Sequence, residues 1–151
     1  MADLSVTLTE SVTLNGSVRG TTNNLTVAGI VDTFERIVTC IEGNVTTIAT
    51  FGTQPYSAAG AIDVDRCKYI RVTNLDTEGW IELAIVGTSD NYQVLLTPQT
   101  SHILSQSEAI LLGEEDTSPS FGTMENLASI QVKPVGSSFN PQVEIFTASI
   151  A

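Results

Sequence analysis

A short alternation of polar and apolar residues, broken repeatedly by turn signals, constrains this chain more than any other feature. In residues 81–86, the apolar residues Ile81, Leu83 and Ile85 alternate with Glu82, Ala84 and Val86. Successive side chains of a strand point to opposite faces, so this period of two predicts strands with one buried face and one wet face. The sequence therefore predicts a β-rich protein whose sheets each cover a core on one side.

The composition agrees with that pattern. The chain holds 27 Val and Ile and 20 Thr, but only 6 Lys and Arg. Side chains that are branched at Cβ suit strands, whereas long exposed helices favour Ala, Leu, Glu and Lys. A chain of 151 residues buries about 68% of its unfolded surface, which supports one core. We expect a single all-β domain.

We expect about ten short strands, the number and spacing that are typical of a sandwich or barrel. The candidate strands lie in residues 5–8, 11–14, 25–31, 34–41, 45–51, 70–73, 81–86, 92–96, 101–105, 109–112, 127–132 and 143–147. The fold class predicted is an antiparallel β-sandwich, with a jelly roll as the first choice.

Turn chemistry predicts the connections. Asn15-Gly16 predicts a tight hairpin turn, because both residues tolerate positive φ. We expect residues 34–41 and 45–51 to form a hairpin around Glu42-Gly43-Asn44. Residues 52–60 and 113–122 are predicted loops. A turn of helix fits only residues 123–128.

The chain divides into an N-terminal strand-rich segment, residues 1–31, and a β-sandwich, residues 32–151. Two interpretations of the first segment stay open. It contributes strands to the protein's own sandwich, or it is an arm that adds a strand to a neighbour's sheet edge.

The charge of −11 and the pI of about 4.1 argue against a nucleic-acid surface and against an anionic membrane. The basic residues Arg66, Lys68 and Arg71 are interleaved with Asp63 and Asp65, as in solvated strand ends. No run approaches the roughly 20 apolar residues of a bilayer span. The first four residues have no basic region and no apolar run, so we expect no secretory signal.

Cys40 and Cys67 belong to no C-x-x-C motif. We expect two buried free thiols, with a single disulfide as the alternative. A zinc site needs further ligands that one histidine does not supply.

The residues yield no catalytic, cofactor or metal assignment, and we expect no enzyme. Ser101 adjoins His102, the one histidine, but neighbours on a strand point to opposite faces and so make no triad. No carboxylate pair stands out as a glycosidase pair.

Calcium is the one cation that the acidic residues suggest. Asp63 and Asp65, Glu114 to Asp116, and Asp90-Asn91 supply oxygen ligands but lack EF-hand spacing. Ordinary solvated acids are the alternative. Trp80 follows Gly79 at a strand start, where it covers the end of a core or anchors a ligand.

Residues 68–104 carry a resemblance to a known class of proteins. The segments are Lys68 to Asp76 (KYIRVTNLD), Ile81 to Ile85 (IELAI), Tyr92 to Pro98 (YQVLLTP) and Ser101 to Leu104 (SHIL). This run resembles small β-sandwich virion proteins of tailed bacteriophages, especially those of marine and cyanobacterial hosts, with a weaker echo at residues 145–151. The resemblance implies a capsid decoration or cement protein, or a small tail or fibre component, without catalytic residues.

These observations lead to an expected function. We expect a non-enzymatic virion structural protein, located in the virion after assembly in the host cytoplasm. Its expected partners are the major capsid protein or other virion proteins, and further copies of itself, with a trimer favoured. The rival hypothesis is a carbohydrate- or ligand-binding module that uses Trp80, Tyr92 and nearby acids.

Overall fold

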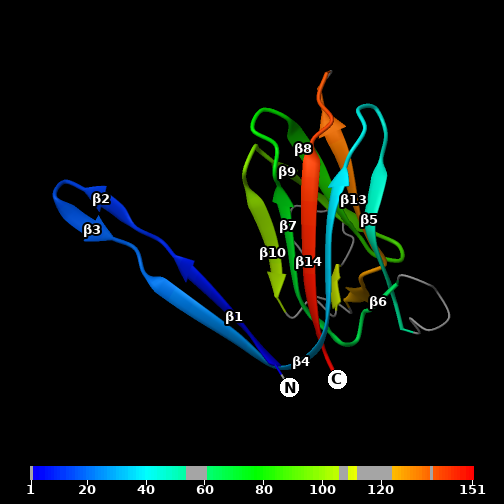
Figure 1. The fold of residues 1–151 in the computed structure, drawn as a ribbon, viewed down its shortest axis with the longest axis horizontal. Helices are drawn as coiled ribbons and strands as arrows, with labels where there is room; N and C mark the ends of the chain where they lie inside the picture. The colour runs from blue at the N-terminus through cyan, green and yellow to red at the C-terminus, as the bar shows by residue number, and fades with distance from the viewer. Residues whose placement is uncertain (1, 54–60, 106–108, 112–123, 137) are drawn as a thin grey trace.

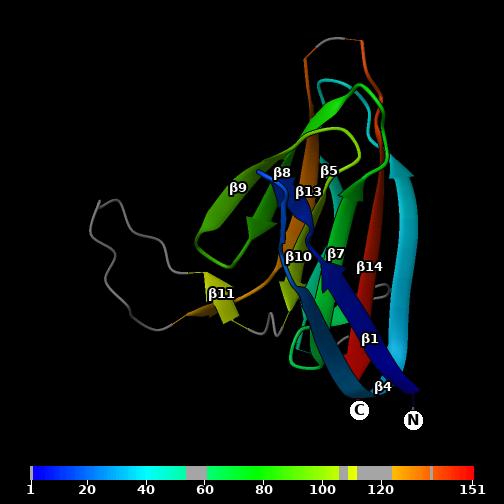
Figure 2. The same ribbon diagram turned by 90° about the vertical axis from the view of Figure 1, so that its left-hand side faces the viewer.

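The computed structural model describes residues 2–53, 61–105, 109–111, 124–136 and 138–151. Two five-stranded sheets lie face to face and a long hairpin projects from one of them (Figures 1 and 2). Within these ranges, no helix is long and apolar enough to cross a membrane.

The first sheet, called sheet A, has the strand order β1-β4-β14-β7-β10. Its strands are β1 (Ala2–Thr9), β4 (Thr22–Thr39), β14 (Gln142–Ile150), β7 (Cys67–Asn74) and β10 (Ser101–Ser105). The second sheet, sheet C, has the order β6-β5-β13-β8-β9. Its strands are β6 (Ile62–Asp63), β5 (Thr46–Gly52), β13 (Ser129–Val135), β8 (Trp80–Val86) and β9 (Asn91–Leu96).

Two small ribbons complete the described strands. The tip of the projecting hairpin pairs β2 (Val12–Leu14) with β3 (Ser17–Arg19). A second ribbon pairs β11 (Ala109–Leu111) with β12 (Glu125–Asn126).

The pairing of the eight main strands is nested. The first strand, β4, pairs with the last, β14, and the second, β5, pairs with β13. Inside these, β7 pairs with β10 and β8 with β9, all antiparallel. The four pairs alternate between sheet A and sheet C. An eight-stranded double sheet wound in this way is a jelly roll, so the predicted fold class is confirmed.

The main core lies between the sheets and follows the predicted alternation. Ile81, Leu83 and Ile85 of β8 are fully buried. On β9, Tyr92, Val94 and Leu96 pack against the same core. β9 ends at Leu96, two residues before Pro98, which has no N–H to continue the ladder.

The buried amide of Asn74 fastens one end of the sandwich. Its Nδ2 group donates to the carbonyl oxygens of Gly79, Leu96 and Thr97, at 2.8, 3.3 and 3.2 Å. Asp76 organises the turn that follows, because its Oδ1 accepts from the N–H groups of Glu78 and Gly79. These backbone bonds hold the pKa of Asp76 below its ordinary value.

The predicted hairpin of residues 34–41 and 45–51 is wrong. Residues 34–39 belong to β4 in sheet A, whereas β5 lies in sheet C. The turn itself has the expected chemistry, with Gly43 at φ +74 and a hydrogen bond from Asn44 N to the Ile41 carbonyl. It carries the chain from one sheet to the other, since β4 pairs with β14 and β5 pairs with β13.

Residues 123–128, the one segment in which a turn of helix fits, form no helix in their described part. Thr123 lies outside the described residues, and Glu125 and Asn126 form strand β12. The Glu125 carboxylate reaches the β8–β9 turn, where it accepts from the N–H groups of Ser89 and Asp90, both at 2.9 Å, and from the Thr88 hydroxyl. These bonds lower the pKa of Glu125 and tie the segment to sheet C in extended form.

Candidate functional site: the amino-terminal hairpin arm

The N-terminal strands form a long hairpin, here called the arm, residues 2–30. One register runs through its length, from Leu4 opposite Val27 to Leu14 opposite Ser17. Asn15 and Gly16 close it with φ of +51 and +76, as a two-residue hairpin turn requires. The predicted turn is therefore confirmed.

Gly20 allows the arm to continue between β1 and the tip. A Cβ at this position would lie 2.0 Å from the Glu10 carbonyl oxygen, and the residue has φ +123. Only glycine accommodates both the close approach and this conformation. Glu10 N donates to the Thr21 carbonyl at 2.9 Å beside it, so the two strands stay paired here.

The two faces of the arm differ in chemistry. On β1 and β2 the even-numbered positions carry Leu4, Val6, Leu8, Val12 and Leu14, with Glu10 among them. The partner strand adds Asn23 opposite Leu8, Arg19 opposite Val12 and Ser17 opposite Leu14 to the same face. The odd-numbered residues of the same stretch are Asp3, Ser5, Thr7, Thr9, Ser11 and Thr13. The arm is thus amphipathic with the period of a strand, the pattern of a strand that buries one face.

Hydroxyl and amide groups link the two strands on the polar face. The Thr7 hydroxyl donates to Asn24 Oδ1 at 2.9 Å, and the Thr9 and Thr22 hydroxyls lie 3.2 Å apart. Cross-strand pairs of this kind each contribute about 0.2–1 kcal/mol. They stabilise the hairpin without any contact to the sandwich.

The base of the apolar face packs against the outer surface of sheet A. Val27 and Ile30 form a small buried cluster with Tyr69 and Ala148. The Tyr69 and Phe146 rings meet edge to face, with centroids 6.1 Å apart. Tyr69 points away from the main core and is nevertheless only 3% exposed, because the arm base covers it.

Burial of the apolar face falls steadily towards the tip. Leu4 and Val6 are half-buried, whereas Leu8, Val12 and Leu14 are 52%, 57% and 56% exposed. Figure 1 shows the reason, since the arm leaves the foot of sheet A and extends away from the sandwich. Three large apolar side chains of one face therefore lie in solvent.

The junction between the arm and the sandwich lies at residues 29–31. Gly29 has φ +77, and its N–H donates to Asp3 Oδ1 at 3.2 Å. The pairing with β1 ends at Ile30, and the pairing with β14 begins there after a register shift. β4 therefore belongs to the arm in its first half and to the jelly roll in its second.

Charge separates the two parts as well. Residues 1–31 carry Asp3, Glu10 and Arg19, a net −1 of the chain's −11, which leaves −10 for residues 32–151. Arg19 is the one charged residue between Ser11 and Val31. Glu10 and Arg19 cancel in the outer part of the arm, whereas the sandwich is strongly acidic.

Among the described residues, the side chain of His102 is hydrogen-bonded to Tyr92. Its Nε2 atom shares a hydrogen bond of 2.8 Å with the Tyr92 hydroxyl, and the two rings meet edge to face. Burial lowers the pKa of His102 and raises that of Tyr92. The pair joins β9 to β10 across the edge of the sandwich, which gives the histidine a structural role.

Trp80 and Tyr92 lie on opposite faces of sheet C. Trp80 is 45% exposed on the outer face, whereas Tyr92 packs against the core. The structure therefore does not bring together the two aromatic residues that the rival ligand-binding hypothesis combines.

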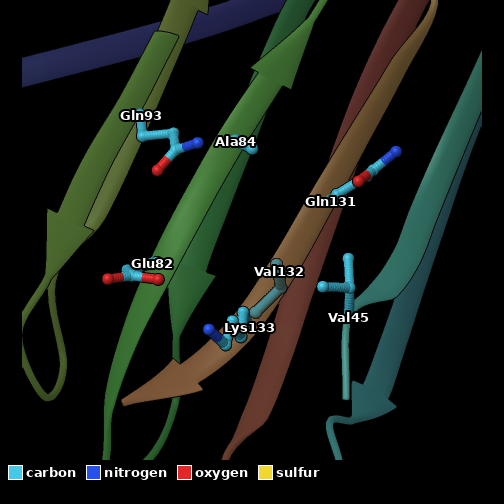
Figure 3. Close-up of a pocket in the computed structure, with 7 residues that line it drawn as sticks. All are labelled: Val45, Glu82, Ala84, Gln93, Gln131, Val132 and Lys133. Atoms are coloured by element: carbon cyan, nitrogen blue, oxygen red, sulfur yellow. The ribbon is translucent and has the colours of Figure 1, made fainter. Parts of the chain in front are cut away.

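The outer face of sheet C has a shallow hollow, which Figure 3 shows in close-up. Its volume is about 120 Å³, below the roughly 300–1,000 Å³ of typical ligand pockets. The residues that line it are Val45, Glu82, Ala84, Gln93, Gln131, Val132 and Lys133. No aromatic side chain lines this hollow.

The candidate cation ligands are placed as follows. Asp63 accepts from Asp65 N at 3.0 Å through Oδ1, and its Oδ2 lies 3.4 Å from Arg66 Nε. Glu114 to Asp116 lie outside the described residues. In the part of the chain that the structure describes, no three His, Cys, Asp or Glu residues are grouped to hold a metal ion.

Both thiols are free and buried, as the sequence predicted. Burial raises the pKa of Cys67 to about 11 and also raises that of Cys40. They are fully protonated at neutral pH and belong to the core.

The alternation in residues 5–14 predicts strands, but it does not by itself show that the apolar face of the arm is exposed as a surface. The signal was present in one strand, because apolar residues occupy the even-numbered positions from Leu4 to Leu14 except Glu10. That partner strand adds Leu25 and Val27 to the apolar face only near the base.

Comparison of the chain with protein-family models, with curated proteins and with solved structures gave no match.

Proposed function

We propose that this protein is a non-enzymatic structural protein of a tailed-bacteriophage virion, a capsid decoration protein that stabilises the head through protein–protein contacts. The observation that carries the proposal is the arm, which presents Leu8, Val12 and Leu14 to solvent on one face. A two-stranded hairpin is marginally stable alone in water, so an amphipathic hairpin of this length is suited to packing on a partner.

The jelly-roll body supports the proposal by analogy of fold. Double-sheet jelly rolls recur in viral capsid proteins, although they also occur in lectins and cupins, so the fold alone does not assign a function. The resemblance of residues 68–104 to phage virion proteins points the same way. The partner in this role is the major capsid protein or another virion protein, and the protein acts as a homo-oligomer, with a trimer favoured.

The acidic charge fits a protein that is made separately and then added to a particle. A charge of −10 on residues 32–151 opposes aggregation of the free protein. The weakly charged arm is the surface on which association costs least electrostatically.

Quantitative mass spectrometry of purified phage particles tests the function. A decoration protein is present at a fixed ratio to the major capsid protein in heads separated from tails. A few copies per particle, confined to the tail fraction, would favour a tail or fibre component instead. Complete absence from washed particles would contradict a virion role.

A further inference from the structure

The second half of β4, residues 31–39, forms an open edge of sheet A. β14 pairs with this stretch on one side, whereas β1 pairs with β4 only as far as Ile30. Among the described strands, none pairs with residues 31–39 on the other side. Figure 1 shows this half of β4 on the side of the sandwich away from the arm, so the arm does not cover the edge.

The backbone of this edge presents a row of hydrogen-bonding groups. Cys40 N donates to the Pro141 carbonyl at 2.9 Å, so the even-numbered residues of β4 bond to β14. Because bonded and non-bonded pairs alternate in an antiparallel ladder, the N–H and C=O groups of Thr33, Glu35 and Ile37 point outwards. Residues 32–39 also run in unbroken register and contain no proline. The edge is therefore a template for a further strand.

The side chains of this edge complement a second copy of the same edge. In an antiparallel pair with a two-fold axis at Phe34, Asp32 lies opposite Arg36 of the second copy. The two-fold axis repeats this pair, so two contacts between opposite charges form. Thr33 lies opposite Glu35 of the second copy, whose carboxylate accepts from the hydroxyl. Opposite charges and hydroxyl pairs in such positions each contribute about 0.2–1 kcal/mol.

The neighbouring two-fold registers lack this complementarity. A register centred on Glu35 places two carboxylates directly opposite each other, and one centred on Arg36 does the same with two guanidinium groups. Like charges in directly opposite positions destabilise a strand pair. A register centred on Ile37 forms no charge pair. Charge therefore favours the register centred on Phe34.

A hollow of about 200 Å³ lies beside the same edge, between β4 and β5. Phe34 lines it, is half-buried and packs against the main core. The other residues that line it are Arg36, Thr47, Ile48, Ala49 and Thr50. In the register centred on Phe34, the two Phe34 residues form a non-hydrogen-bonded pair, in which side chains of an antiparallel ladder lie closest. The second ring thus covers the hollow and completes the burial of the first.

The net charge of the edge is small. Residues 31–39 hold Asp32, Glu35 and Arg36, which give −1 of the −10 on residues 32–151. The two acidic bodies repel each other at long range, but the Debye length of about 8 Å at physiological ionic strength screens that repulsion. The contact is therefore decided by the groups that meet at the edge.

We infer that two copies of this chain pair through the open edge of β4, antiparallel and about a two-fold axis at Phe34, so that their A sheets join into one. The same patch is used on both copies, so the contact is closed and makes a dimer. It leaves both arms free. The inference goes beyond the proposed function, because it adds a contact between copies through the body.

Light scattering after size exclusion tests the contact. The unaltered chain is expected to have the mass of two chains of 16.0 kDa. Arg36→Asp places two acids opposite each other in both charge pairs and is expected to reduce the mass to that of one chain. Arg19→Asp is the matched control, because it makes the same change in net charge at an exposed position on the arm. It should leave the mass unchanged.

Mixing two variants tests the register. Asp32→Arg places two bases opposite each other and should also give the mass of one chain. When Asp32→Arg protein is mixed with Arg36→Asp protein, every charge pair again joins an acid and a base, and the mass of two chains should return. This recovery would show that both variants are folded. A mixture that stays at the mass of one chain overturns the inference.

The unaltered chain provides two further outcomes. A monomer at all concentrations overturns the inference, and so does a mass of three chains, because a two-fold contact joins copies in pairs. A trimer would at the same time agree with the oligomer that the proposed function favours. The proposed function fails separately, through absence of the protein from washed particles.

Discussion

The arm and the jelly-roll body are built from the same kind of strand, yet only the body buries its apolar face. In β8, Ile81, Leu83 and Ile85 are fully buried, because sheet A lies opposite them. In the arm, Leu8 and Leu14 follow the same alternation and are more than half exposed. Identical local patterns thus produce a core in one region and a free surface in the other, and the difference is set by what faces each strand.

The comparison implies that the stability of the fold and the contacts of the arm reside in different regions. The body supplies the buried area that stabilises the fold, at roughly 25 cal/mol per Å² of apolar surface. The arm adds a base cluster around Tyr69 and leaves the rest of its apolar face available. Changes in the body should therefore lower the free energy of unfolding, and changes in the outer arm should not.

The largest effect is expected for Leu83→Ala. It removes a fully buried side chain and should lower the free energy of unfolding by about 3 kcal/mol, measured by urea denaturation. Leu8→Ala in the arm is the paired variant and should change it by less than about 0.5 kcal/mol. Comparable losses from both would show that the arm unfolds as one unit with the body.

Asn74→Ala is expected to cost about 2 kcal/mol. It leaves the carbonyl groups of Gly79, Leu96 and Thr97 without the amide that bridges them at the buried end of the sandwich. Asn91→Ala, at an exposed position on β9, serves as the control and should be nearly neutral. A neutral result for Asn74→Ala would mean that water replaces the amide there.

Acidification should weaken the body through His102. Burial lowers its pKa from the ordinary 6.5, so the unfolded chain binds more protons just below that pH. The contribution of His102 to the free energy of unfolding is therefore fully present above about pH 6.5. It is lost progressively as the pH falls below that value and through the lowered pKa of the folded state. Denaturation curves at about pH 7.5 and 5.5 measure the loss, and His102→Gln should reduce it. An equal loss in that variant would assign the effect to other groups.

The smallest effect on the body is expected for Gly20→Ala. The new Cβ collides with the Glu10 carbonyl oxygen, so the pairing of β2 with β3 should be lost locally. Hydrogen exchange should show faster exchange in residues 12–19, while the melting temperature of the body stays the same. Ser17→Ala, at the exposed end of the tip, is the control. A lower melting temperature would contradict the independence of the tip.

Local chemistry was enough to predict much of the arm and of the strand faces. Asn15-Gly16 identified the hairpin turn, and the alternation in residues 81–86 identified the core residues of β8. Both depend on neighbours a few positions apart, where backbone preference and side-chain period decide the result. The all-β class and the jelly-roll choice followed from the number and spacing of such segments.

The sequence by itself determined most strand and turn positions and the apolar face of strands such as β8, because those properties are local. Only the tertiary structure decided which strands pair and which apolar faces are covered. The turn at Gly43 has the same chemistry whether it closes a hairpin or crosses between sheets, so residues 34–51 were misassigned. The nested pairs, such as Thr33 with Ala148, join residues far apart in the chain, and their choice depends on the total area that all strands bury together. The same long-range balance leaves Leu8, Val12 and Leu14 more than half exposed.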